Sequence, residues 1–364
     1  MKAKAAVFMG ANNPFEIREY ELIPPKPGYA KMSLIASGVC GTDIHIHNGK
    51  LGGAPNTMIG HEFVGRIEEI SEEDSKKYGL NVGDAVISDI AVPCCKCLLC
   101  ENGDDANCVN MSVTSAGDVN DAPHFHGGYG EYSYAPASNL IKIPIEVDPK
   151  MAAIFACPAP TAIHGFSLAE RAGVDLKKVK TAVVQGLGPV GCFAIAYLAS
   201  AGVENVIAVS GGVDAQKDAL AKDLGATKVY SLKNDGEEKI AGEIKDMTNG
   251  LGADLVYEAS GNPKAIPFGM DILRNRGVYV VPGQYSDSGA VEIQPQIITF
   301  KALHIIGSSQ YSFSDVESYV DFLAKNPALH EKIAALATCY KVEDINKAFD
   351  DAKARKNVKT LLVK

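Results

Sequence analysis

The sequence predicts an α/β protein of two domains, one rich in short β-strands and one built on a doubly wound parallel sheet. Three observations support this prediction. The 364 residues exceed what one hydrophobic core usually serves, and 46% hydrophobic residues can fill two cores. Up to about residue 155 the chain reads as short β segments and loops, whereas from about residue 180 apolar segments alternate with helical stretches.

Alternating polar and apolar residues, together with turn-forming residues between them, identify the individual elements. Residues 31–36 alternate between polar and apolar side chains, and Gly, Pro and Asn interrupt the surrounding sequence. After residue 310, two polar helical stretches precede a final strand at 359–363. We therefore assign one domain to residues 1–158 with 310–364, and the other to residues 159–309. The second domain contains five apolar segments that we expect to form parallel strands: 182–184, 206–209, 255–257, 278–281 and 303–306.

The charge balance limits the class of partner. The formal net charge is -9 and the pI is near 5.4, so no basic surplus exists to neutralise nucleic-acid phosphates or an acidic membrane surface. We expect a small-molecule partner. Residues 181–203 are uncharged and long enough to span a bilayer, but Gly186, Gly188, Pro189 and Gly191 divide them into a strand, a turn and a helix.

Cysteine usage predicts metal binding in a reducing compartment. The amino terminus lacks the long apolar run of an export signal, so the nine cysteines are expected as thiols in the cytoplasm. Cys94, Cys97, Cys100 and Cys108 stand in a C-x2-C-x2-C-x7-C pattern, in which four thiolates can enclose one Zn²⁺ tetrahedrally. Such a closed site leaves no position for a substrate, so we predict a structural role. The alternative is a set of reduced thiols without metal, and Cys95 is expected not to be a ligand.

A second group of metal-binding residue types is spread along the chain, namely Cys40, His61, Glu62 and Cys157. Separately each is weak evidence, because a lone cysteine is usually a small buried hydrophobe and a lone histidine is usually a hydrogen-bonded one. Their spacing alone leaves open whether these residues bind a metal.

A glycine-rich turn follows the first apolar strand of the second domain. Its G-x-G-x-x-G pattern opens a helix predicted to run to about residue 201. Glycines at this spacing let the backbone approach a pyrophosphate on the helix amino terminus. The pattern predicts a Rossmann domain that binds NAD or NADP, and the alternative is an ordinary tight turn. The residues of the turn are Gly186, Leu187, Gly188, Pro189, Val190 and Gly191.

The next predicted strand lacks the acid that usually binds the adenosine ribose of NAD, because it ends in Ser210, Gly211 and Gly212. Without that acid nothing repels a 2′-phosphate, so NADP is admissible, with Ser210, Gly211 and Lys217 as candidate contacts. Asp214 could still fold back and serve NAD. Both cofactors stay open, with NADP slightly favoured.

Two later strands also end near glycines, Gly261 after 255–257 and Gly283 with Gln284 after 278–281. Ligands of doubly wound sheets collect at the carboxyl ends of the strands. These glycines are therefore expected to approach the nicotinamide.

Together these motifs give the whole chain a family resemblance. Residues 38–43, residues 60–62, the four-cysteine segment, residues 127–132 and the glycine-rich turn follow one another in a characteristic order. The sequence thereby resembles the zinc-containing medium-chain dehydrogenase/reductase superfamily, the group of alcohol, sorbitol and threonine dehydrogenases. The resemblance covers nearly all of the chain and implies a GroES-like, β-rich catalytic domain joined to the Rossmann domain.

The resemblance implies a catalytic zinc held by Cys40, His61 and Cys157, with water or substrate in the fourth position. Glu62 is implied as an alternative or exchanging ligand, because many polyol-oxidising relatives place a carboxylate in the region of Cys157. Asp43 would then accept a hydrogen bond from the other ring nitrogen of His61 and fix its tautomer. One zinc is thus implied to be catalytic and one structural.

The reaction implied by the resemblance is hydride transfer between a secondary alcohol or polyol, or the matching ketone, and NAD(P). Zinc acts as a Lewis acid on the alcohol, Thr42 passes the alcohol proton through the cofactor ribose to His45, and Thr161 lies near the nicotinamide. A homodimer or homotetramer formed through the cofactor domain is also implied. Two alternatives stay open: a zinc-independent quinone or enoyl reductase, and a zinc-stabilised cofactor-binding protein without catalysis.

Overall fold

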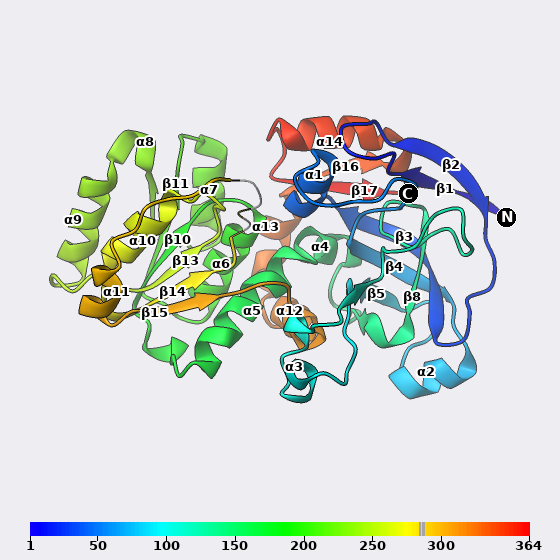
Figure 1. Ribbon diagram of the computed structural model, residues 1–364, viewed down its shortest axis with the longest axis horizontal. Coiled ribbons are helices and arrows are strands. Elements are labelled where there is room, and N and C mark those ends of the chain that lie inside the picture. Colours follow the sequence, from blue (N-terminus) through cyan, green and yellow to red (C-terminus); the bar gives the residue numbers. More distant parts are fainter. Residues whose placement is uncertain (284, 286–287) are drawn as a thin grey trace. The chain divides into compact units, whose positions relative to one another are not determined.

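The chain forms two compact units, shown in Figure 1 as a computed structural model that describes residues 1–283, 285 and 288–364. Unit 1 comprises Met1–Pro160 and Gln310–Lys364, and unit 2 comprises Thr161–Ser309. The chain first passes from unit 1 to unit 2 within helix α5 (Pro158–Arg171). Gln284, which follows Gly283 at the predicted end of the strand 278–281, lies outside the described residues.

Unit 1 is mostly antiparallel β-structure. Its strands are β1 (Lys2–Val7), β2 (Glu16–Glu21), β3 (Tyr29–Gly38), β4 (Glu62–Glu69), β5 (Ala85–Ser88), β6 (Ala91–Val92), β7 (Ser112–Val113), β8 (Tyr132–Pro136), β9 (Leu140–Lys142), β16 (Ala337–Lys341) and β17 (Lys359–Val363). Its helices are α1 (Gly41–His47), α2 (Glu72–Tyr78), α3 (Leu98–Glu101), α4 (Pro149–Ala152), α12 (Phe313–Lys325), α13 (His330–Ala334) and α14 (Ile345–Lys353). The main sheet has the order β16-β17-β3-β4-β5-β9, β8 also pairs with β3, and only β16 and β17 run parallel.

Strand β3 shows how the sequence pattern builds this sheet. Along its first part buried and half-buried residues alternate, which places Ala30, Met32 and Leu34 in the core of unit 1. At its end the alternation stops, and Ser37 and Gly38 are both buried because β4 and β17 flank this part of the strand. The chain that leaves β3 therefore starts from a buried, rigid position.

Unit 2 is a doubly wound sheet with helices around it (Figure 1). Its strands are β10 (Thr181–Gln185), β11 (Asn205–Ser210), β12 (Lys228–Ser231), β13 (Ala253–Glu258), β14 (Leu273–Val281) and β15 (His304–Gly307). Besides α5, its helices are α6 (Pro189–Ser200), α7 (Ala215–Asp223), α8 (Leu232–Asp235), α9 (Glu237–Met247), α10 (Ala265–Ile272) and α11 (Gln296–Lys301). The strand order is β12-β11-β10-β13-β14-β15 and every pairing is parallel.

The strand order places a switch point between β10 and β13. From β10 the chain proceeds outward through β11 and β12, then returns to β13 on the other side of β10. Helix α6 packs with α7, whereas α10 packs with α9 and α11, so two groups of helices cover the sheet. In such sheets a ligand binds beyond the carboxyl ends of the strands at the switch point.

The five predicted strands of unit 2 are present, and the sequence analysis missed β12. That strand, Lys-Val-Tyr-Ser, has only one aliphatic residue and four residues in all, so it carries no apolar run. The uncharged stretch 181–203 divides into β10 and α6 as expected. In the part of the chain that the structure describes, no single helix is long and apolar enough to cross a membrane. One bent pair, Pro149–Phe155 with Pro158–Arg171, passes that test by length and composition only.

Candidate active site

The four clustered cysteines of unit 1 converge on one point. The Sγ atoms of Cys94, Cys97, Cys100 and Cys108 all lie within 4.8 Å of one another. The Cys97 sulfur is 3.5 Å from that of Cys100 and 4.0 Å from that of Cys108. Four thiolates bound tetrahedrally to zinc, with bonds of about 2.3 Å, place their sulfurs about 3.8 Å apart. The donor set and its size therefore fit one zinc ion, and the exposed Cys95 lies outside the group.

Backbone hydrogen bonds favour the thiolate form of one cysteine in this cluster. Cys97 immediately precedes α3, and hydrogen bonds from the backbone of Cys100 and Val109 lower the pKa of its thiol from 9.0 to about 6. The thiolate is the form that binds metal. The segment is also tied to α12, because Asp105 accepts a hydrogen bond from the hydroxyl of Ser312 at the start of that helix.

Three separate segments of unit 1 bring the second group of ligands together. Cys40 precedes α1, His61 and Glu62 stand at the start of β4, and Cys157 precedes α5. One ligand atom from each of these four residues lies within 4.8 Å of the others, and the two sulfurs are 4.0 Å apart. A hydrogen bond with Cys157 and the charge of His61 hold the pKa of the Cys40 thiol well below 9.0. Two thiols, one imidazole and one carboxylate form a donor set that suits zinc.

Asp43 contacts two members of this group, Cys40 and His61. Its fully buried carboxylate accepts hydrogen bonds from the Tyr129 hydroxyl at 2.6 Å and the Cys40 N–H at 2.9 Å, and its Oδ1 faces His61 Nδ1 at 3.2 Å. The contact with Nδ1 leaves Nε2 of His61 available to a metal. Gly60 has φ +97°, and a Cβ there would lie 2.6 Å from the Tyr129 ring. Glycine at this position therefore lets the tyrosine reach Asp43.

The sequence analysis missed a buried cation beside Glu62. Lys359, the first residue of β17, forms an ion pair with Glu62, and the two side chains are 2% and 0% exposed. Gly38 makes room for this pair, because a Cβ there would overlap both side chains. Burial raises the pKa of Glu62 from 4.5 to about 7 against the opposing attraction of Lys359. No local motif marks Lys359, since only the sheet brings β17 to this end of β4.

Thr42 and His45 lie in α1, one helical turn apart, so their side chains share a face of the helix. Both residues are half-buried. The Nδ1 atom of His45 is buried and has no hydrogen-bond partner among the residues that the structure describes. The ring therefore has one nitrogen open to a further partner.

The glycine-rich turn of unit 2, residues 186–191, joins β10 to α6 as expected. Gly186 has φ +97°, and a Cβ on Gly191 would overlap the carbonyl oxygen of Gly186, so both positions need glycine. Gly188 is the N-cap of the 12-residue α6, no side chain caps the helix, and the space at its Cβ position is open. Pro189 occupies the first position of the helix, where its missing N–H loses nothing. This open helix start fits the pyrophosphate of a dinucleotide.

The end of β11 presents hydroxyl and glycine but no open carboxylate. The Ser210 hydroxyl donates a hydrogen bond to the Gly212 carbonyl oxygen at 2.7 Å, and Gly211 is exposed. Asp214 is the N-cap of α7 and accepts a hydrogen bond from the Lys217 N–H at 3.1 Å. Its carboxylate also lies 3.4 Å from the Lys217 ammonium. Asp214 is thus engaged in capping and in an ion pair.

The remaining predicted cofactor contacts also lie in unit 2. Gly261 follows β13 and Gly283 follows β14, the two strands beyond the switch point. Thr161 is half-buried in the first turn of α5.

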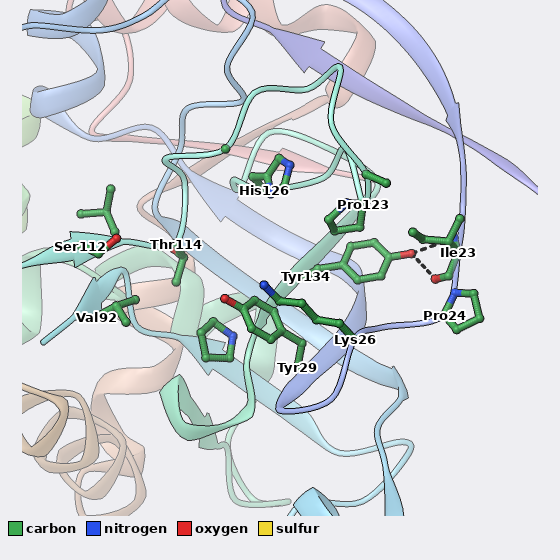
Figure 2. A pocket seen from close by; sticks show the side chains of 14 residues that line it. Ile23, Pro24, Lys26, Tyr29, Val92, Ser112, Thr114, Pro123, His126 and Tyr134 are labelled. Carbon is green, nitrogen blue, oxygen red and sulfur yellow. Dashed lines mark hydrogen bonds between the residues drawn. The ribbon is translucent and has the colours of Figure 1, made fainter. Parts of the chain in front are cut away.

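A pocket of about 350 Å³ in unit 1 is built from other residues (Figure 2). On one side the Tyr134 hydroxyl donates a hydrogen bond to the Ile23 carbonyl oxygen at 2.7 Å and accepts one from the Ile23 N–H at 3.2 Å. On another side the Lys26 ammonium lies 4.0 Å from the centre of the Tyr29 ring. His126 also lines this pocket, which shares no residue with either group of metal ligands.

Both parts of the chain match known protein families. Residues 26–145 match the alcohol dehydrogenase GroES-like domain, and residues 189–325 match the zinc-binding dehydrogenase family. An erythritol/L-threitol dehydrogenase of Mycolicibacterium smegmatis is 33% identical over 302 residues, which are 80% of this chain and 79% of the relative.

Two further comparisons cover nearly the whole length. A 5-exo-hydroxycamphor dehydrogenase of Pseudomonas putida is 29% identical over 368 residues, covering 99% of this chain and 98% of the relative. The crystal structure of an alcohol dehydrogenase from Thermotoga maritima matches with a TM-score of 0.90 and 26% identity, covering 100% of this chain and 99% of that chain.

Proposed function

The chain belongs to the family of zinc-binding dehydrogenases with a GroES-like domain, and on that premise we propose that Cys40, His61 and Cys157, with Glu62 beside them, are its catalytic zinc site. The protein is a zinc-dependent oxidoreductase that transfers a hydride between an alcohol or polyol and NAD(P). One observation carries the assignment of the site: four side chains from three separate segments place their ligand atoms within 4.8 Å of one another.

The chain's own residues determine what this site can do. Zinc bound here supplies a Lewis acid that lowers the pKa of an alcohol, so that its carbon can release hydride. Asp43 fixes the ring of His61 and hydrogen-bonds the backbone of Cys40, which preorganises both ligands. With three protein ligands a coordination position stays open for substrate, whereas the four-cysteine cluster is closed and serves a structural role.

The alcohol proton needs an acceptor, and α1 provides two candidates. We assign the Thr42 hydroxyl to take the alcohol proton first, and His45 to pass this proton to solvent. His45 suits this role because it shares a face of α1 with Thr42 and its Nδ1 has no hydrogen-bond partner within the described part of the chain.

The cofactor is assigned to the carboxyl end of the unit 2 sheet, with its pyrophosphate on the start of α6. Two observations support a preference for NADP. Ser210 occupies the position at which NAD-binding domains usually have an acid, and that acid would repel a 2′-phosphate. Asp214, the other candidate acid, is engaged as a helix cap. Lys217 carries the nearby positive charge. The proposed substrate is a secondary alcohol or polyol, in keeping with the two relatives named for hydroxycamphor and for erythritol or threitol.

The sheet of unit 2 supports a proposal on assembly, and the cysteines of the chain support one on location. A homodimer or homotetramer through β15 is proposed because this strand ends the sheet and its Ile305 is 43% exposed. A cytoplasmic location is proposed because no disulfide joins any of the nine cysteines.

The test is cofactor reduction by zinc-loaded protein against a panel of polyols, amino alcohols and simple alcohols, with NAD and NADP in parallel. Cys40→Ala should abolish turnover and lower the zinc content from two to one per chain. Cys339→Ala, which removes an exposed cysteine outside both metal groups, is the matched control and should leave both unchanged. Cofactor binding without turnover on any alcohol would favour the non-catalytic alternative.

A further inference from the structure

Unit 2 contains a fully buried carboxylate, Glu258, at the end of β13. Its Oε1 accepts a hydrogen bond from the Ser260 N–H at 2.8 Å, and its Oε2 accepts one from the Gly261 N–H at 3.4 Å. The hydroxyls of Ser260 and Tyr285 also donate to it. Because backbone N–H groups can only donate, each of the two oxygens accepts at least one hydrogen bond.

No positive charge in the described part of the chain forms an ion pair with this carboxylate. The four donors that the described residues provide are all neutral, although a buried charge is normally paired. The tyrosines around it respond to the negative charge, since burial and Glu258 together raise the pKa of Tyr279 and Tyr285. Glu258 therefore contributes a negative charge that the chain itself does not cancel.

Glu258 lies at the switch point of the sheet. It pairs in register with Gln185, the residue that precedes the glycine-rich turn. A Cβ on Gly186 would lie 2.7 Å from the Cα of Ser260, so the loop that Glu258 holds is in contact with that turn. A Cβ on Gly283 would overlap the Glu258 carboxylate. The charge thus lies directly beneath the glycines that end β13 and β14.

The strand order identifies which half of the cofactor lies over this charge, given the proposed cofactor site on which the inference rests. In a doubly wound sheet the pyrophosphate lies at the first turn and the adenosine ribose at the end of the next strand, here β11. Strand β11 is on one side of β10, so the nicotinamide half extends to the other side, over the ends of β13 and β14. Gly261, Gly283 and the buried Glu258 are at this end of the sheet.

We propose that Glu258 determines redox selectivity in cofactor binding, by favouring the oxidised nicotinamide over the reduced one. The oxidised ring carries a positive charge and the reduced ring is neutral, so a buried carboxylate beneath it attracts only the oxidised form. Burial keeps salt and water from screening this attraction. At an effective dielectric constant of about 20, two opposite unit charges about 4 Å apart attract by about 4 kcal/mol, and about a third of that energy already corresponds to a tenfold difference in affinity.

The test compares dissociation constants of oxidised and reduced cofactor, measured by calorimetry on the zinc-loaded protein and on Glu258→Gln. The variant should weaken binding of the oxidised form about tenfold and change that of the reduced form by less than about twofold. 2′-Phospho-ADP-ribose, a fragment of NADP that lacks the nicotinamide, should bind equally to both proteins. Glu237→Gln, which removes an exposed charge from the same unit, is the matched control.

Each outcome bears on one statement. Equal weakening of both redox forms would overturn the inference, because Glu258 would then only position the loops, while the proposed function would stand. A wild-type protein that binds neither form would refute the proposed cofactor site instead. If Glu258→Gln fails to bind the ADP-ribose compound, Tyr285→Lys decides the matter. A cation placed against the carboxylate should lower the preference for the oxidised form, and an unchanged preference would refute the role.

Discussion

Replacing Lys359 by methionine tests whether the buried pair with Glu62 supports the folded state. Methionine retains most of the apolar stem of lysine but removes the charge, so the packing volume changes little. The carboxylate left behind is 0% exposed and cannot recover its hydration. Removing one partner of a buried ion pair typically costs about 3–5 kcal/mol, and we expect a loss of this size.

The chain provides a control with the same chemistry and the opposite exposure. Lys76 and Glu72 form an ion pair on α2, and their side chains are 76% and 83% exposed. Such a pair, four residues apart on a helix, contributes about 0.3–0.5 kcal/mol, so Lys76→Met should be almost neutral. Comparing the two variants isolates the effect of burial from that of losing a lysine.

Hydrogen exchange is the suitable assay, because a chain with two units need not unfold in one transition. The opening free energies of β4 and β17 amides should fall in Lys359→Met and stay unchanged in Lys76→Met, with all proteins saturated with zinc. Adding Glu62→Gln to Lys359→Met should restore much of the loss, because the buried charge is then gone. If Lys359→Met lies within about 1 kcal/mol of Lys76→Met, the assumed cost of the uncompensated charge is refuted.

Three further predictions concern other parts of the chain. Burial raises the pKa of Asp89 from 3.8 to about 7, so its contribution to stability is fully present below pH 3.8 and is lost as pH rises through about 7. Asp89→Asn should therefore flatten the unfolding free energy between these pH values in urea titrations. Ser312→Ala removes the N-cap of α12 and the contact with Asp105, which should cost about 1–2 kcal/mol in thermal unfolding, whereas Ser314→Ala, without a capping role, should cost little. Ser210→Asp should raise the dissociation constant of NADP at least about tenfold and not that of NAD, and equal effects would contradict the proposed 2′-phosphate contact.

Features that depend on a short local motif were the most predictable from the sequence. The four cysteines lie within one short segment, so their spacing alone predicted the cluster that the structure shows. The glycine-rich turn likewise depends on neighbouring residues, and its strand and helix are where the pattern placed them. By contrast, Cys40, His61 and Cys157 come from three distant segments, and their convergence was expected only through the family resemblance.

The burial and pairing of charged residues depend on tertiary structure and could not be predicted from the sequence. Lys359 carries no motif, and it meets Glu62 only because β17 and β4 both flank β3 at Gly38. Glu258 belongs to a strand ending that was noted only for its glycine, and its burial follows from the packing of Gly283 and Tyr285 above it. The short strand β12 was missed for a related reason, because its pairing with β11 compensates for a sequence without an apolar run.

Two buried glutamates, Glu62 and Glu258, show how one type of residue can serve stability in one unit and ligand selection in the other. Glu62 and Glu258 are both 0% exposed, but of the two only Glu62 forms an ion pair with a cation in the described part of the chain. Its positive partner, Lys359, is permanent, so the pair contributes to the folded state whether or not a ligand is bound. Glu258 has only neutral donors among the residues that the structure describes, so we assign its complementary positive charge to a ligand. Lys359→Met should therefore alter stability irrespective of the redox state of the cofactor, and Glu258→Gln should alter the affinity for one redox state.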